Sequence, residues 1–334
     1  MGHVHLLCDT FPASYGSSGI RTRSQQIGQT ETALSVELIS ANLLSPMVLA
    51  FALGFLATLI KSDLKLPEGL YTSLSIYLLF AIGLKGGAEL SVTPVSQLWA
   101  PALGTLVVSL VTAWIAYIAS RKLGKLDKAN AASFAAHYGS VSAVTFIAAE
   151  SFATLQGLKF EGFMPALVAL LEIPAILFAL AYLGRAKDGA KVGVVVRELF
   201  TGKEGMAQVQ PLFGDLFKGA LTIFLLEMGL VAASRVDELK ANALFIGLFA
   251  TLVPLVNGLI GVVIGHYCGL SDGGAGILGA MAASASYIAA PAAVRIALPS
   301  ANPSLYLTAA LAVTFPFNLL VGIPLFQQVA QALG

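Results

Sequence analysis

Charged residues are scarce in this sequence, and their scarcity excludes most classes of soluble protein. Only 11% of the 334 residues are charged, whereas 57% are hydrophobic. A soluble domain carries about 25% charged residues, so this chain cannot cover a water-exposed surface of the expected size. The formal net charge is +1, and no run of Lys and Arg indicates a nucleic acid partner.

Cysteine is also rare, and the sequence shows no secretory signal. The only cysteines, Cys8 and Cys268, lie far apart and have no disulfide or metal-binding spacing. Residues 1–35 are polar and rich in Ser, Thr and Gln, without the apolar core and cleavage site of a secretory signal. We expect them to form a disordered leader. An upstream extension of the reading frame and a transit peptide are the alternatives.

Long hydrophobic runs are what the sequence does contain. They approach the roughly 20 residues that a helix needs to cross a bilayer. The predicted spans are Leu44–Ile60, Leu70–Leu84, Leu98–Ser120, Ala131–Phe152, Phe163–Leu183, Leu216–Ala233, Ala241–Gly265, Gly274–Ala293 and Leu305–Ala330. The sequence therefore predicts an all-α polytopic membrane protein.

Two halves of the chain resemble each other weakly and in the same order. The segment LYTSLSIYLLFAIGLKGGAEL from Leu70 matches LFKGALTIFLLEMGLVAASRV from Leu216. Three Leu and one Gly are identical, and the two members of each pair lie 146 residues apart. A Ser-x-Ser motif also recurs after 144 residues, as Ser140 and Ser142 and then as Ser284 and Ser286. Such duplication of helical halves is typical of secondary transporters.

The distribution of Lys and Arg predicts that the halves are inverted. Cations gather in alternate loops, which places the N-terminal end of the first half outside and its fifth span running inward. We predict a first repeat at 36–184, a cytoplasmic linker at 185–212 and a second repeat at 213–334. The linker contains only VGVVV where a sixth span should lie, so the second repeat is predicted to lack its first helix. An internal deletion is the alternative.

The repeated Ser-x-Ser segments predict a binding site. HYGSVSAVTF at 137–146 and ASASYIAAPAAVR from Ala283 place small, polar and helix-weakening residues (Gly139 and Pro291) within oily spans. Broken helices survive in a membrane only where protein surrounds them. The amides at a new helix end favour an anion, and the carbonyls at the other end suit Na⁺. The alternative is that these serines only pack helices together.

Other polar residues inside the spans are candidates for sodium binding or coupling. Glu172 and Glu227 are carboxylates in apolar segments, where charge is expensive and usually functional. Each could instead pair with a neighbouring cation or remain protonated. The full set of coupling candidates is Thr145, Glu172, Glu227 and Asn318.

An intramembrane hydrolase is the least favoured class. His137 precedes Ser140 by three residues, but GSVSA is not a G-x-S-x-G elbow and no acid has suitable spacing. We therefore predict that the protein is not an enzyme.

Four motifs resemble the cyanobacterial sodium-dependent bicarbonate transporter family (SbtA-type), from about Val36 to the C-terminus. They are NLLSPMVLAFALGFLA, FAAHYGSVSAVTF, DLFKGALTIFLLEMGLVA and MAASASYIAAPAAVR. The resemblance implies ten helices in two inverted five-helix repeats, with core and gate domains, assembled as a homotrimer. Nine of these ten helices are recognisable in this sequence, and the sixth is apparently missing.

The resemblance also implies Na⁺-coupled bicarbonate uptake across the cytoplasmic membrane for inorganic carbon concentration. It implies no cofactor beyond Na⁺ as the coupling ion, and a PII-like regulatory protein as cytoplasmic partner. The substrate-binding residues that it implies are Gly139, Ser140, Ser142, Ser284, Ser286 and Tyr287. Open alternatives are a Na⁺ symporter of another small anion and a transport-deficient homologue that only binds the PII-like regulator.

Overall fold

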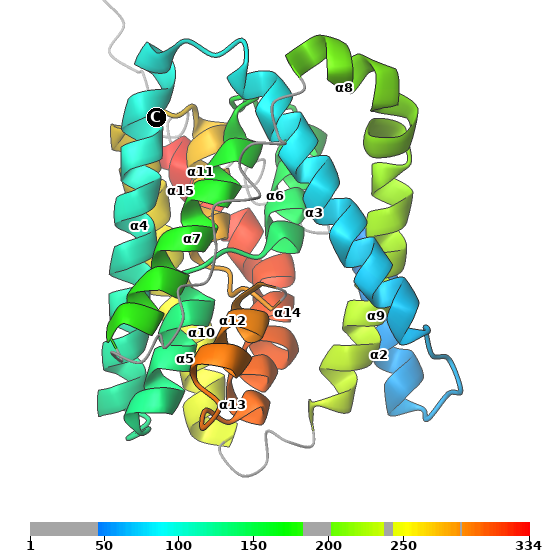
Figure 1. Ribbon diagram of the computed structural model, residues 1–334, viewed down its shortest axis with the longest axis vertical. Helices are drawn as coiled ribbons and strands as arrows, with labels where there is room; N and C mark the ends of the chain where they lie inside the picture. Colours follow the sequence, from blue (N-terminus) through cyan, green and yellow to red (C-terminus); the bar gives the residue numbers. More distant parts are fainter. Residues whose placement is uncertain (1–45, 183–201, 237–242, 288) are drawn as a thin grey trace, which may run out of the picture. The chain divides into compact units, whose positions relative to one another are not determined.

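The oily segments fold into helices in the computed structural model, which describes residues 46–182, 202–236, 243–287 and 289–334. The described part of the chain contains helices and no strands (Figure 1). The predicted all-α class is therefore confirmed. The leader predicted at 1–35 lies outside the described residues.

The observed helices follow the predicted spans closely. Their bounds are α2 (Pro46–Leu59), α3 (Glu68–Leu90), α4 (Val95–Lys122), α5 (Lys128–Tyr138), α6 (Ala143–Leu155), α7 (Met164–Tyr182), α8 (Gly202–Gln210), α9 (Phe217–Ser234), α10 (Ala243–Tyr267), α11 (Asp272–Ala282), α12 (Ala289–Ala297), α13 (Pro303–Thr308), α14 (Phe315–Phe317) and α15 (Ile323–Leu333). The π-helical turns η2 (Pro211–Asp215), η4 (Ala309–Thr314) and η5 (Asn318–Gly322) connect some of them. The last of these elements form one continuous helix, Pro303–Leu333.

Length and composition allow four of the described helices to cross a membrane. They are α4, α9, α10 and the continuous helix Pro303–Leu333. Exposure on α4 is inverted relative to a soluble protein: Trp99, Leu103 and Leu110 are exposed, whereas Thr105 and Ser109 are fully buried. A helix that turns its large apolar residues outward and its hydroxyls inward suits a lipid environment. The count of nine spans stays a prediction.

Two predicted spans are interrupted in the structure. The segment Ala131–Phe152 divides into α5 and α6, and Gly274–Ala293 divides into α11 and α12. Gly139 lies in the first interruption, as predicted, but Pro291 does not lie in the second. It is the third residue of α12, where the missing proline N–H costs nothing because first-turn amides have no intrahelical acceptor.

The described residues of the region where a sixth span is predicted to be missing form the short helix α8, which continues into the π-helical turn η2. Helix α8 has 9 residues, which corresponds to roughly 14 Å at 1.5 Å per residue. A bilayer core is about 30 Å thick, so α8 by itself cannot cross it. It packs on α3, where Met206 joins a small cluster with Leu84 and Ala88. The rest of this region, 183–201, lies outside the described residues.

Helices α2 and α9 pack against each other through glycine. A Cβ added at Gly54 would overlap the carbonyl oxygen of Leu226, and one added at Gly229 would overlap that of Phe51. The backbones can approach this closely only because both positions lack a side chain. The hydroxyl of Thr58 then donates to the carbonyl of Leu230 at 3.3 Å across the same interface.

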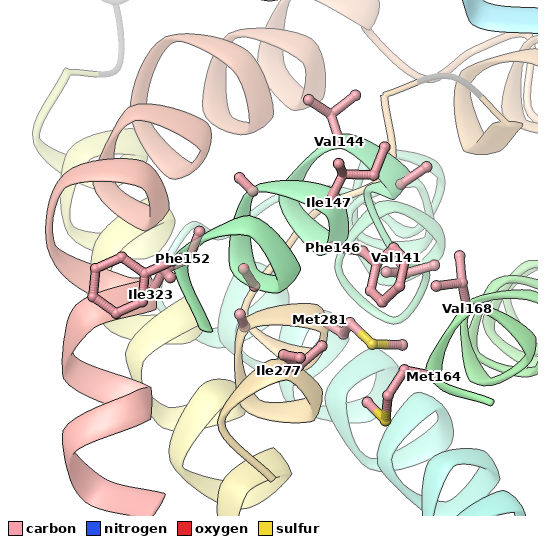
Figure 2. Packing of buried hydrophobic residues seen from close by; sticks show 14 of the residues in the cluster. Val141, Val144, Phe146, Ile147, Phe152, Met164, Val168, Ile277, Met281 and Ile323 are labelled. Atoms are coloured by element: carbon pink, nitrogen blue, oxygen red, sulfur yellow. The ribbon is translucent and has the colours of Figure 1, made fainter. Parts of the chain in front are cut away.

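The largest buried cluster joins residues from both halves of the chain. Figure 2 shows Val141 and Phe146 together with Met164 of α7 and Met281 of α11 in this cluster. Helix α4 packs against α5, α7 and α10, and α10 packs along α11. Helices α5 and α11, one from each interrupted segment, therefore both pack against the long helix α4.

Candidate functional site

The first interruption is a four-residue link between α5 and α6. Helix α5 ends at Tyr138, and Ser142 caps α6 by accepting a hydrogen bond from the Thr145 amide at 3.1 Å. A serine at this position satisfies one first-turn amide, which otherwise has no acceptor. The chain can therefore leave one helix and start another while fully buried.

The second interruption follows the same scheme. Helix α11 ends at Ala282, and the Ser286 hydroxyl accepts from the Ala290 amide at 3.2 Å in the first turn of α12. Ser142 and Ser286, the second serines of the two motifs, thus each accept a hydrogen bond from an amide in the first turn of the helix that follows. Helices α5 and α11 also have the same length, 11 residues each.

The two interruptions cross and hydrogen-bond to each other. The Ser142 amide donates to the Ser284 hydroxyl at 2.8 Å. The Ser286 amide donates to the carbonyl of His137 at 2.8 Å. Each broken segment therefore gives one backbone amide to the other, and the serines predicted as a site from sequence lie together. We call residues 139–142 and 283–287 the crossing.

The hydroxyls at the crossing are not equivalent. Ser142 and Ser286 cap helices, while Ser284 accepts from Ser142 and donates to the Met281 carbonyl at 2.7 Å. The Ser140 hydroxyl is fully buried and has no hydrogen-bond partner among the described residues. Among these serines, only Ser140 keeps an uncommitted hydroxyl.

Comparison with known protein families identifies the family of the chain. A model of the Na⁺-dependent bicarbonate transporter superfamily matches residues 46–203 and 191–331. The chain belongs to this superfamily. No curated protein matches the chain. The family and the apolar helices together make it a multi-pass membrane protein that belongs with transporters of bicarbonate and sodium.

Tyr287 connects the crossing of this bicarbonate transporter homologue to α2. Its side chain is buried, and its ring lies edge-on to that of Phe315 with centroids 5.7 Å apart. Phe315 in turn packs edge-on against Phe51 of α2 at 5.3 Å. The sequence predicted Tyr287 as a substrate contact, and the structure places its ring in a row with those of Phe315 and Phe51.

Two of the coupling candidates lie at the crossing. Thr145 is buried in the first turn of α6 and bonds to Ser142 through its amide. Asn318 is buried in η5, and its side-chain amide donates to the Ala283 carbonyl at 2.8 Å. That carbonyl belongs to the second interruption, so Asn318 contacts the crossing directly.

The two carboxylates occupy different positions. Glu172 follows Leu171 in α7, whose carbonyl accepts from the Ser109 hydroxyl at 3.1 Å. The same hydroxyl lies 3.0 Å from the Gly139 carbonyl, so Glu172 is one residue removed from a direct link to the crossing. Glu227 lies on α9, which packs against α2 and α3. Its Oε2 is buried without a hydrogen-bond partner among the described residues.

Sequence reasoning missed two contributions to this site. The Ser109 hydroxyl of α4 donates a hydrogen bond to the Gly139 carbonyl. In the sequence, Ser109 stood out only as a hydroxyl residue inside an apolar helix. His137 contributes its backbone carbonyl to Ser286, while its ring is fixed elsewhere: Nδ1 lies 2.6 Å from the Ser133 carbonyl and the ring packs on Tyr306. A backbone role leaves no signal in side-chain chemistry.

The arrangement does not form a nucleophile–base pair. His137 Nε2 and the Ser140 hydroxyl are both buried, and neither has a hydrogen-bond partner within the described ranges. They are therefore not bonded to each other, whereas covalent catalysis needs such a contact. This geometry favours binding over hydrolysis.

Proposed function

We propose that this protein takes up bicarbonate by Na⁺-coupled symport. Membership of the superfamily supports the two substrates. The observation that carries the proposal is the crossing, where two interrupted helices exchange backbone hydrogen bonds inside the protein. Paired half-helices of this kind bind small charged solutes in secondary transporters, with no need for a charged side chain.

The anion would lie against the starts of α6 and α12. First-turn amides carry the positive end of the helix dipole and favour a carboxylate-like group. Ser140 would donate its free hydroxyl, Gly139 would leave room for the anion, and Tyr287 would close the site from the α12 side. Ser142, Ser284 and Ser286 would hold the amides in position. Bicarbonate is a small monoanion, so amides and hydroxyls match it better than a bulky guanidinium.

We further propose that the chain is built from inverted repeats with core and gate domains. In support, α5 and α11 are equal in length, and each is followed by a serine-capped half-helix. Helices α2 and α3, which both pack on α9, would form the gate together with it. The repeats at 36–184 and 213–334 and the linker at 185–212 belong to this proposal, as does the loss of the sixth span.

The setting of transport is proposed from the family resemblance. The protein would reside in the cytoplasmic membrane as a homotrimer, and a PII-like regulator would bind its cytoplasmic face. The cations available there are Arg121, Lys122, Lys125 and Lys128 at the end of α4 and the start of α5. Most of the basic stretch from Arg185 to Lys203 lies outside the described residues.

Uptake of labelled inorganic carbon tests the proposal. Cells that express the protein should accumulate the label when external Na⁺ is present and lose this uptake when choline replaces it. Equal uptake in choline would refute symport. Na⁺-dependent uptake of another labelled small anion, without uptake of labelled inorganic carbon, would identify the symporter of a different anion.

A transport-deficient homologue that only docks the PII-like regulator is the second candidate. One observation favours it: α8 is too short to replace a sixth span. In that case the purified protein would capture the regulator while cells show no Na⁺-dependent uptake. Replacing Arg121, Lys122 and Lys125 by Gln should weaken the capture. Undiminished capture by this variant would place the docking surface elsewhere.

A further inference from the structure

Asn257 is a buried amide without an evident structural purpose. It lies in the apolar helix α10 within the run LVPLVNGLIGVV, and its side chain is fully buried. Neither its Nδ2 nor its Oδ1 has a hydrogen-bond partner among the described residues. Buried polar groups are nearly always paired, and leaving one unpaired is costly. The buried, unpaired amide of Asn257 therefore indicates a ligand-binding role.

The packing of α10 shows where this side chain points. Asn257 shares a buried face with Ala250, two turns before it, and with Gly261, one turn after it. The Ala250 carbonyl accepts from the Thr314 hydroxyl at 2.8 Å. A Cβ added at Gly261 would lie 2.7 Å from the Cβ of Ala282. Asn257 thus faces the space between the π-helical turns of 309–322 and the end of α11.

Asn318 approaches the same end of α11 from the other side. Its Nδ2 donates to the Ala283 carbonyl, and its Oδ1 is buried without a partner among the described residues. The Phe326 ring joins the two neighbourhoods: it would meet a Cβ added at Gly258, and it lies 3.1 Å from one added at Gly322, which in turn would lie 2.5 Å from Asn318 Oδ1. Two buried amides, Asn257 on α10 and Asn318 in η5, therefore lie on elements that contact α11 or the residue that follows it, Ala283.

The chemistry at this point is that of a cation ligand set. The last carbonyls of a helix carry the negative end of its dipole and lack intrahelical donors. Amide and carbonyl oxygens are hard, neutral ligands, and transporters use the C-terminal ends of broken helices to coordinate Na⁺. Groups of His, Cys, Asp and Glu suited to a transition metal are absent from the described residues.

We propose that Asn257 and Asn318 bind the coupling Na⁺ together with backbone carbonyls at the end of α11. The identity of the cation rests on the proposed function, whereas the site itself rests on two buried amides whose oxygens have no hydrogen-bond partner among the described residues. Asn318 was a coupling candidate from sequence, and Asn257 is new. The cation would lie within a few residues of Ser284 and Ser286, which places it next to the proposed anion position.

Sodium binding to the purified protein tests this site without transport. The assay measures ²²Na⁺ binding and Na⁺-dependent thermal stabilisation in detergent, in the absence of bicarbonate. Asn257→Leu keeps the shape of the side chain and removes its oxygen. We expect it to raise the half-saturating Na⁺ concentration about tenfold or more, which is what the loss of a bond to a charged group produces. Asn257→Asp keeps an oxygen and should retain binding.

Thr251→Val is the matched control. Thr251 lies on the same helix, and among the described residues its hydroxyl bonds within that helix, to the carbonyls of Gly247 and Leu248. Its substitution should leave Na⁺ binding unchanged. Equal Na⁺ binding by the wild type and Asn257→Leu would overturn the proposed site while leaving Na⁺-coupled transport intact. Failure of the wild type to bind Na⁺ in the presence as well as in the absence of bicarbonate would overturn both.

Discussion

Replacing Ser140 by Ala is the substitution that best separates binding from packing. The Ser140 hydroxyl is buried and makes no hydrogen bond among the described residues. Ser140→Ala therefore removes no bond from the described fold and leaves one unsatisfied group fewer. If the serines only packed helices, the variant would be as stable as the wild type and would transport equally well.

The binding interpretation predicts a different outcome. A hydrogen bond to a charged group is worth about 1.5–3 kcal/mol, and each 1.4 kcal/mol is about a factor of ten in affinity. Ser140→Ala should therefore raise the half-saturating bicarbonate concentration about tenfold or more. The thermal stability of the purified variant should equal or exceed that of the wild type.

Ser284→Ala is the structural comparison for this experiment. It removes the acceptor of the Ser142 amide and the donor to the Met281 carbonyl. We expect this variant to lose thermal stability as well as transport, because the crossing itself is loosened. The assay is uptake of labelled bicarbonate, normalised to protein in the membrane, with unfolding followed in detergent. An unchanged half-saturation in Ser140→Ala would refute the reasoning.

Three further predictions concern packing, capping and the link to α4. Gly229→Ala should sharply reduce the folded yield, measured by size-exclusion chromatography, because its Cβ would overlap the Phe51 carbonyl; Gly219→Ala, which meets open space, is the control. The Asn130 amide holds the pKa of Asp127 below its usual range in the loop before α5. This stabilisation is present above the usual Asp pKa and is lost as the pH falls through the lowered pKa; Asp127→Asn should abolish that component of the pH dependence of Tm, and an identical profile would refute it. Ser109→Ala should lower Tm by removing the donor to Gly139 and Leu171, and an unchanged Tm would show that these carbonyls find other donors.

Periodicity and composition predicted the helices because both depend on local sequence. Predicted spans such as Leu98–Ser120 and Leu216–Ala233 agree with α4 and α9 to within a few residues. The interruptions were also predictable, since Gly139 and the hydroxyl residues weaken a helix locally. The role of Pro291 was not, because proline is tolerated in a first turn and disruptive in an interior. Only the position of the preceding break decides between the two.

The division of labour among the serines could not be read from sequence. Ser140 and Ser142 have the same chemistry and differ only in what the fold places beside them. Ser142 becomes a cap because α6 starts after it, and its amide finds Ser284, a residue 142 positions away. Asn257 gave no periodic or motif signal at all. Its importance arises because its side chain has no hydrogen-bond partner among the described residues, and only the packed structure reveals this.

The short chain distance between the proposed cation and anion positions has a thermodynamic consequence. Ala283 accepts from Asn318 on the cation side, and Ser286 starts the capped half-helix on the anion side. A cation held at the end of α11 lowers the electrostatic cost of bringing an anion to the start of α12. By linkage, bicarbonate must then raise the affinity for Na⁺ by the same factor as Na⁺ raises the affinity for bicarbonate. Coupling between the two ions would therefore follow from the crossing itself, and it would not require either carboxylate, Glu172 or Glu227, to change its charge.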